Sequence, residues 1–388
     1  MKMVSPFTDE NQFGNSVAQS VLDAFRRLPS HGKPIVRANG LKEWTTLAGI
    51  VAHNVEENTF ECISLATGVK CNAVSKIDQA KLGCVLHDCH AEILALRGFN
   101  RVLLENIKNI KEGKPSNILI KKEKEDKFKC PKKMTFHLYV SECPCGDASM
   151  ELLIKKSKDK EPWRLRNETP NQPLRGRADF SQLGIVRTKP GRADSPCSWS
   201  KSCSDKLSAR EYLSLCNAQT SLLVQPIYLS TLVLPTEVVE ESAIKRAFGA
   251  TGRLAPLAEV CIPPYKFTPF QVLQCDVPFE YANTSNSSEK KVTSTNVQLW
   301  MGNVVQQREV IHNGIRSGVK ATNFEKAMSL VCRRQLMHLL KAIQPALTND
   351  ANYANWKEEN KERREAKRLL MSVMKGWMPN EGSDFVWD

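Results

Sequence analysis

The sequence has no hydrophobic run long enough to cross a lipid bilayer. Its most apolar stretch, SLLVQPIYLSTLVL at 221–234, is interrupted by Gln225 and Pro226 and falls short of the roughly 20 residues that a spanning helix needs. The first residues, MKMVSPFTDENQF, contain no apolar core of the kind found in secretory signals. We therefore expect an intracellular protein, located in the nucleus, the cytoplasm or both, with no membrane partner.

Acidic residues are too few to balance the basic ones. Lys and Arg together number 55 against 42 Asp and Glu, which gives a net charge of +13. Such a surplus favours a polyanionic partner, although charge alone does not distinguish nucleic acid from an anionic membrane or a phosphorylated ligand. In a chain without an export signal, the 13 cysteines are expected to be thiols and metal ligands rather than a disulfide framework.

The chain also lacks internal repeats and long polar linkers, so we expect a single domain over residues 1–388. Alternating strands and helices in the first half indicate an α/β protein. A segment rich in Lys and Glu at 108–133 is interpreted as a charged surface insertion. Hydrophobic spacing predicts helices at 15–29, 90–107, 147–156, 208–223, 323–343 and 353–377, and strands at 45–53, 60–71, 134–142 and within 221–234.

The segment SECPCGDASM at 141–150 contains one cysteine of a metal-binding turn and lacks the second. Zinc deaminases of nucleobases carry H-x-E followed by P-C-x-x-C, whereas here the third residue after Cys145 is Ala148. His90 and Glu92 form the H-x-E pair at the start of a predicted helix. Cys145 lies where a strand leads into a helix, and a helix N-terminus stabilises a thiolate.

A catalytic zinc ion needs only three protein ligands, because it keeps one position open for water. His90 and Cys145 can supply two of them, and Glu92 suits a proton shuttle that takes a proton from the activated water. Hydrolytic deamination requires this combination. Proximity in the sequence leaves the third ligand open among five cysteines: Cys89, Cys143, Cys197, Cys203 and Cys216.

Four motifs occur together and in order: DCHAEILALR at 88–97, CPCGDAS at 143–149, KPGR at 189–192 and SCSDK at 202–206. They resemble the deaminase domain shared by the adenosine deaminases acting on RNA and their tRNA-specific relatives. The resemblance covers roughly residues 15–387. It implies a cytidine-deaminase-like three-layer sandwich, with a mixed central sheet and appended C-terminal helices. It also implies one zinc ion held by His90, Cys145 and Cys203, with Glu92 as the proton shuttle.

The same resemblance implies the reaction, which is conversion of adenosine to inosine in RNA. The KPGR loop is similar to the tRNA branch of the family, and the match begins too early to leave room for double-stranded-RNA-binding domains. We therefore expect inosine formation at position 37 of tRNA-Ala, beside the anticodon. Alternatives are a deaminase of cytidine or of another structured RNA, and a non-catalytic RNA-binding subunit with structural zinc. We expect no DNA partner and no obligate protein partner.

Two further ligand sites are implied by the resemblance. The substrate-pocket positions of the family fall on Thr46, Val69 and Lys70, and Lys189 and Arg192 are expected to contact tRNA. The family also holds inositol hexakisphosphate inside its core, where buried cations would need a counter-charge. The matching positions are Arg97, Lys206, Ser221, Arg333, Tyr353, Lys357, Arg363, Lys367 and Trp377. Some depart from the family pattern: Leu96 replaces an arginine, Arg333 a common lysine and Arg363 a tyrosine.

Overall fold

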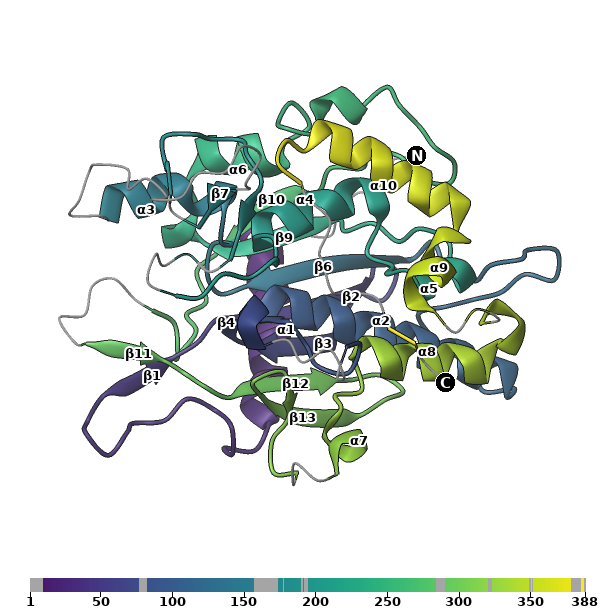
Figure 1. Cartoon of the computed structure of the whole chain (residues 1–388), viewed down its shortest axis with the longest axis horizontal. Helices are drawn as coiled ribbons and strands as arrows, with labels where there is room; N and C mark the ends of the chain where they lie inside the picture. Colours follow the sequence, from purple (N-terminus) through teal and green to yellow (C-terminus); the bar gives the residue numbers. More distant parts are fainter. Residues whose placement is uncertain are drawn as a thin grey trace.

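A computed structural model describes most of the chain, namely residues 10–76, 82–156, 174–176, 178–189, 191, 195–283, 290–319, 323–348, 350, 352–377 and 385–386. An eight-stranded sheet runs through this part, and helices cover both of its faces (Figure 1). The sheet is mixed, which confirms the predicted α/β class and the cytidine-deaminase-like arrangement. No helix among the described residues combines the length and hydrophobicity needed to cross a membrane.

The strands of the central sheet follow the order β10-β9-β6-β2-β3-β12-β13-β14. Strands β6, β9 and β10 are parallel to one another, and the remaining neighbours are antiparallel. The predicted hairpin is the antiparallel pair β2–β3. Their bounds are β2 Leu47–Asn54, β3 Thr59–Thr67, β6 Met134–Val140, β9 Thr231–Pro235, β10 Gln271–Cys275, β12 Val297–Met301, β13 Gln307–His312 and β14 Ile315–Arg316.

Strand β2 shows why the sheet is covered on both sides. Successive side chains of a strand point to opposite faces, and every residue of β2 is buried. Leu47 and Val51 pack with helix α1 (Glu10–Arg27), whereas the alternate residues Ala48 and Ile50 pack with helix α2 (Ala91–Lys111). Gly49 permits the close approach of α1, because a Cβ at this position would lie 2.6 Å from Val21 Cγ1.

The remaining elements surround this core. Helix α8 packs on α2, and α10 packs on α4. A separate apolar cluster, which includes Tyr212, Leu254 and Leu370, fills the space beneath α10. These elements are β1 Lys42–Trp44, β4 Val69–Cys71, β5 Asp88–His90, α3 Met150–Lys156, β7 Leu174–Arg175, β8 Arg187–Thr188, α4 Cys203–Leu213, α5 Thr220–Leu223, α6 Glu241–Phe248, β11 Lys291–Thr293, α7 Phe324–Ala327, α8 Arg333–Ile343, α9 Tyr353–Glu358 and α10 Lys361–Val373.

Several predicted helices are shorter than expected. The segment 353–377 divides into α9 and α10, because the side chain of Asn360 accepts a hydrogen bond from Arg363 N and starts a new helix. Cys332 caps α8 in the same way and separates it from α7. Within the apolar run 221–234, residues 221–223 form the end of α5 and residues 224–230 belong to no helix or strand, so only β9 matches that prediction.

The charged segment 108–133 is not wholly a solvated insertion. It begins within α2 and carries many exposed Lys and Glu side chains. Ile118, Leu119 and Phe128, however, are buried in the main hydrophobic core. Three apolar anchors therefore fix this loop to the domain.

Candidate metal centre and active-site cavity

Three potential metal ligands from distant parts of the chain converge at the ends of neighbouring elements. His90 ends β5 and precedes α2, Cys145 follows β6, and Cys203 is the first residue of α4. One ligand atom from each residue lies within 4.8 Å of the others. Among the described residues, no other cysteine of the five candidates joins such a cluster. The structure thus brings together the set implied by the family resemblance.

The spacing of these atoms suits a tetrahedral zinc ion. Bonds of about 2.0–2.1 Å to nitrogen and about 2.3 Å to sulfur place nitrogen and sulfur about 3.6 Å apart. His90 Nδ1 lies 3.5 Å from Cys203 Sγ and 3.8 Å from Cys145 Sγ. The separation of the imidazole nitrogen from the two thiols therefore fits the ligand spacing of a zinc ion.

A glycine allows the two cysteine-bearing turns to meet. Gly146 has a φ of 106°, and a Cβ there would lie 2.1 Å from Ser202 Oγ. Cys203 N lies 3.4 Å from Cys145 Sγ, so the first turn of α4 donates to the sulfur. A hydrogen bond from the Cys203 thiol, together with the nearby charge of Lys189, holds the pKa of Cys145 well below its usual range. This environment favours the thiolate that metal binding requires.

Glu92 lies beside the three ligands without belonging to them. His90 has extended backbone angles (φ −69°, ψ 143°), so the helix begins only after it, and residues two apart need not diverge as they do within a helix. Glu92 is buried, with 3% of its surface exposed, and its Oε2 atom has no hydrogen-bond partner among the described residues. Burial raises the pKa of this carboxyl. A carboxyl group of this kind can accept and return a proton.

A buried network of ion pairs around Asp88 lies next to the metal centre. Asp88 accepts hydrogen bonds from Lys189 Nζ at 2.8 Å, from Ser200 Oγ at 2.8 Å and from Lys206 Nζ. Burial alone would raise the pKa of Asp88, but the two lysines hold it well below its usual range. Lys189 Nζ also lies 3.2 Å from Cys203 Sγ. The network therefore joins Lys206 to a candidate metal ligand.

This geometry corrects the expectation for Lys189. Its side chain is 3% exposed and points to Asp88 and Cys203, so its ammonium group is not available as a surface contact for tRNA. Arg192, the other expected tRNA contact, lies outside the described residues. Asp88 was not singled out in the sequence, although it occupies the first position of the DCHAE motif.

The metal centre opens into a cavity of about 730 Å³. Its lining includes His90, Glu92 and Cys145, together with Thr46, Val69 and Lys70, the positions expected to bind substrate. Trp44 also lines it, two residues before Thr46, and sequence reasoning missed this residue. Trp44 could have been identified from the sequence as an aromatic residue close to a predicted pocket position. An aromatic ring offers a flat surface on which a base can stack.

The residues expected to hold a polyanion gather around α4 and the C-terminal helices. Arg97 on α2 lies near Arg333, and Lys367 lies near both Arg333 and Arg363. Lys357 Nζ is 5.0 Å from the Tyr353 ring centroid. Ser221 Oγ accepts a hydrogen bond from Asn360 Nδ2 at 3.2 Å, and the Trp377 ring centroid lies 5.9 Å from Lys201 Nζ.

Two further cations in this region were missed by the sequence reasoning. Burial, together with the neighbouring charges of Arg363 and Arg97, lowers the pKa of Arg210 to about 10. Burial, together with the charges of Lys206 and Lys367, lowers the pKa of Lys201 to about 8. Mutual repulsion among buried cations is the feature that a bound polyanion would relieve.

Comparison with known proteins agrees with these features. The sequence profile described as the adenosine-deaminase (editase) domain matches residues 64–379. The chain is 53% identical over 376 residues to tRNA-specific adenosine deaminase 1 of Schizosaccharomyces pombe, covering 96% of this chain and 97% of that protein. It is 31% identical over 395 residues to the protein of the same name from Saccharomyces cerevisiae, covering 97% and 95%. A match to double-stranded RNA-specific editase B2 of Rattus norvegicus is shorter, at 29% identity over 233 residues, 57% of this chain and 30% of that protein. The profile match covers most of the chain and includes all three residues of the metal-ligand cluster, and on this basis the chain belongs to the adenosine-deaminase (editase) domain family.

Proposed function

We propose that this protein is a zinc-dependent hydrolase that converts adenosine to inosine in tRNA, at position 37 of tRNA-Ala. The observation that carries the proposal is the cluster of His90, Cys145 and Cys203 beside the buried carboxyl of Glu92, at the base of an open cavity. Two relatives that match nearly the whole chain are named tRNA-specific adenosine deaminases, which supports tRNA as the substrate.

The chain's own residues divide the chemistry among them. His90, Cys145 and Cys203 would hold zinc, which supplies Lewis acidity and lowers the pKa of a water molecule to about 7. Glu92 Oε2, which has no protein partner among the described residues, takes a proton from that water. Glu92 then delivers this proton to a ring nitrogen of the adenine as the water oxygen joins C6. It next passes the remaining hydroxyl proton to the exocyclic nitrogen, so that the bond from C6 to this nitrogen breaks and ammonia leaves.

The cavity accounts for substrate access. An anticodon loop presents bases that are already partly unstacked, so moving one into a pocket costs less than flipping a base from a duplex. Thr46 and Val69 would line the adenosine pocket, and Lys70 would contact a phosphate. A structural zinc site in a binding subunit fits less well, because such sites are closed by four protein ligands and need no adjacent carboxylate.

The direct test is to incubate purified protein with total tRNA and to map inosine by sequencing. We expect inosine at position 37 of tRNA-Ala, and much slower inosine formation by a Glu92→Gln variant that keeps its zinc. An anticodon stem–loop with adenosine at that position and a duplex RNA with a central adenosine form the matched substrate pair. Inosine in the duplex alone, or in no tRNA, would contradict the proposal.

We also propose that inositol hexakisphosphate binds within the cation cluster formed by Arg97, Lys201, Lys206, Arg210, Arg333, Arg363 and Lys367. Burial and neighbouring cations lower the pKa values of Arg97, Arg210 and Lys367, and this excess of positive charge supports a polyanion site. Ser221, Tyr353, Lys357 and Trp377 would complete the site. We expect an acid extract of the purified protein to contain inositol polyphosphate, and refolding to require it. Equal refolding with inorganic phosphate at matched phosphate concentration would contradict this.

A further inference from the structure

The two turns that carry Cys145 and Cys203 are bonded directly to each other. Ser204 N donates to Cys145 O at 3.0 Å, and Ala148 N donates to Ser204 Oγ at 3.1 Å. Ser204 Oγ in turn lies 3.0 Å from Pro144 O. A small movement of either turn would therefore change the distance between the two thiols.

Each turn also carries a buried aspartate two residues after its cysteine. Asp147 and Asp205 are both fully buried, at 0% exposure. A buried carboxylate is stable only when it is paired and hydrogen-bonded. The ion-pair partners of both aspartates are arginines of one short segment, residues 246–253, at the end of α6 and just after it.

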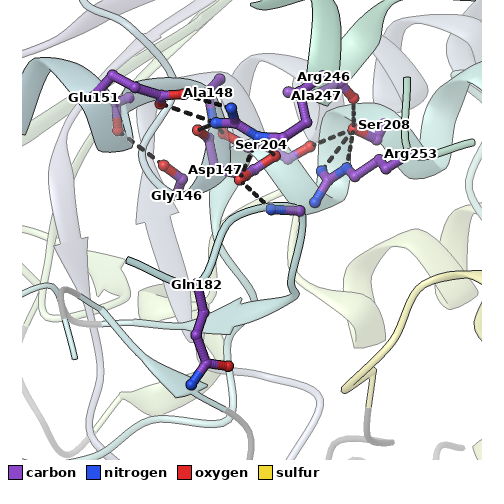
Figure 2. A network of polar contacts seen from close by, with 12 residues as sticks. Gly146, Asp147, Ala148, Glu151, Gln182, Ser204, Ser208, Arg246, Ala247 and Arg253 are labelled. Atoms are coloured by element: carbon purple, nitrogen blue, oxygen red, sulfur yellow. Dashed lines mark hydrogen bonds and ion pairs between the residues drawn. The ribbon is translucent and has the colours of Figure 1, made fainter. Parts of the chain in front are cut away.

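Arg246 holds the Cys145 turn. Its Nε lies 3.1 Å from both carboxylate oxygens of Asp147, and its NH2 donates to Asp147 O at 3.0 Å. The same guanidinium donates to Glu151 on α3, with NH2 2.9 Å from Oε2. Figure 2 shows Arg246 between Asp147 and Glu151, so that one side chain fixes both the turn and the helix that follows it.

Arg253 holds the Cys203 turn. Its NH1 donates to Asp205 Oδ1 at 2.6 Å. Its NH2 donates to Ser208 Oγ at 2.7 Å (Figure 2). The other oxygen of Asp205 accepts from Ser202 Oγ at 2.6 Å and from Arg187 N at 2.9 Å. Asp205 therefore connects Arg253 to the residue directly before Cys203.

The two arginines are joined through the backbone. Arg253 N donates to Arg246 O at 2.9 Å. Gly252 permits this closure, because a Cβ there would lie 2.5 Å from Arg246 O. Ser208 Oγ lies 2.7 Å from Ala247 O, which attaches the segment to α4 as well. The segment 246–253 is thus a closed loop with one arginine directed at each cysteine-bearing turn.

We propose that this loop is a brace that sets the separation of the Cys145 and Cys203 thiolates, with Arg246 and Arg253 as positioning residues for the metal. The inference rests on the proposed zinc site. Neither arginine contacts the substrate cavity; both act through a buried aspartate on a ligand-bearing turn. Metal–ligand distances must hold to about 0.2 Å. Mutation of residues that hold the metal ligands in place therefore commonly lowers metal affinity by about 10–100-fold.

The test compares metal binding by the full-length protein and its Arg246→Met, Arg253→Met, Arg246→Lys and Arg253→Lys variants. Lys245→Met is the matched control, because Lys245 is exposed on the same helix beside Arg246. Zinc affinity is measured by competition with a chromogenic chelator, and site geometry by the visible absorption of the cobalt-substituted protein. Urea unfolding of the metal-free proteins records stability separately.

We expect both methionine variants to bind zinc about 10–100-fold more weakly and to show an altered cobalt spectrum. The lysine variants should recover part of the affinity, since lysine keeps the charge but not the forked geometry. If a methionine variant does not fold, its lysine variant decides the outcome on the same two measurements. If the folded variants bind zinc with wild-type affinity and show an unchanged cobalt spectrum, the proposed role of the loop as a brace is wrong. Failure of the wild-type protein to bind zinc would instead overturn the proposed metal site.

Discussion

Replacing Asp88 by asparagine should destabilise the protein, because this carboxylate compensates two lysines inside the domain. Lys189 Nζ and Lys206 Nζ both pair with it, and the side chains of Asp88 and Lys189 are only 8% and 3% exposed. Asparagine has nearly the same shape, so the packing is kept while the charge is lost. Its amide group would also bring donors toward two ammonium groups that need acceptors.

The expected loss of stability follows from the burial of the Asp88–Lys189 ion pair. Removing one partner of a buried ion pair typically costs about 3–5 kcal/mol, because the other charge is left without compensation. We expect the free energy of unfolding at pH 7 to fall by this amount in Asp88→Asn. Urea unfolding, with an unchanged dependence on urea concentration, measures it. Asp126→Asn is the control, because Asp126 is exposed in the 108–133 segment.

The pH dependence gives a second check with a defined sign. The folded-state pKa of Asp88 is lowered, so its contribution is complete above the unfolded value of about 3.9 and is lost as the pH falls through the lower folded value. The difference between wild type and Asp88→Asn should therefore be largest near neutral pH and shrink in acid. A difference below about 1 kcal/mol at pH 7 would refute the argument that Asp88 compensates buried lysines.

Three further outcomes are expected. Glu92→Gln should keep zinc but lower the deamination rate by about 10²–10⁴-fold, as measured in single-turnover reactions, since general acid–base catalysis contributes on that scale; an unchanged rate would exclude Glu92 as the shuttle. Cys203→Ala should purify with far less zinc than wild type when assayed by metal analysis, whereas Cys197→Ala, an exposed cysteine outside the cluster, should retain it. Burial lowers the pKa of His137 to about 3, so the unfolded state binds a proton first as the pH falls. His137 should then contribute a decrease in stability of about 1.4 kcal/mol per pH unit below about 6.5, and His137→Asn should reduce the slope in urea unfolding between pH 6.5 and 5 by that amount, leaving the contribution of His87, whose pKa burial lowers to about 4.

Hydrophobic spacing along the sequence predicted the helices and strands that depend mainly on their own residues. The hairpin of β2 and β3, the apolar face of α2 and the strand β6 all appear where the sequence placed them. The breaks within the C-terminal helices were missed, since Cys332 and Asn360 act through single capping hydrogen bonds that periodicity does not detect. The inward direction of Lys189 was also missed, because it depends on Asp88 from a segment that is 101 residues away.

The sequence by itself determined the chemistry that the protein can carry: an imidazole, thiols that follow strand ends, and an acidic residue two positions after the histidine. It also determined the family, because four ordered motifs identify it. Only the tertiary structure decided that Cys203, 113 residues from His90, completes the ligand cluster, and that Glu92 Oε2 lies beside it with no hydrogen-bond partner in the described part of the chain. It also decided that one loop joins both cysteine-bearing turns through Arg246 and Arg253. The physical reason is that such contacts depend on how helices and strands pack across the sheet, and spacing along the chain carries no information about that packing.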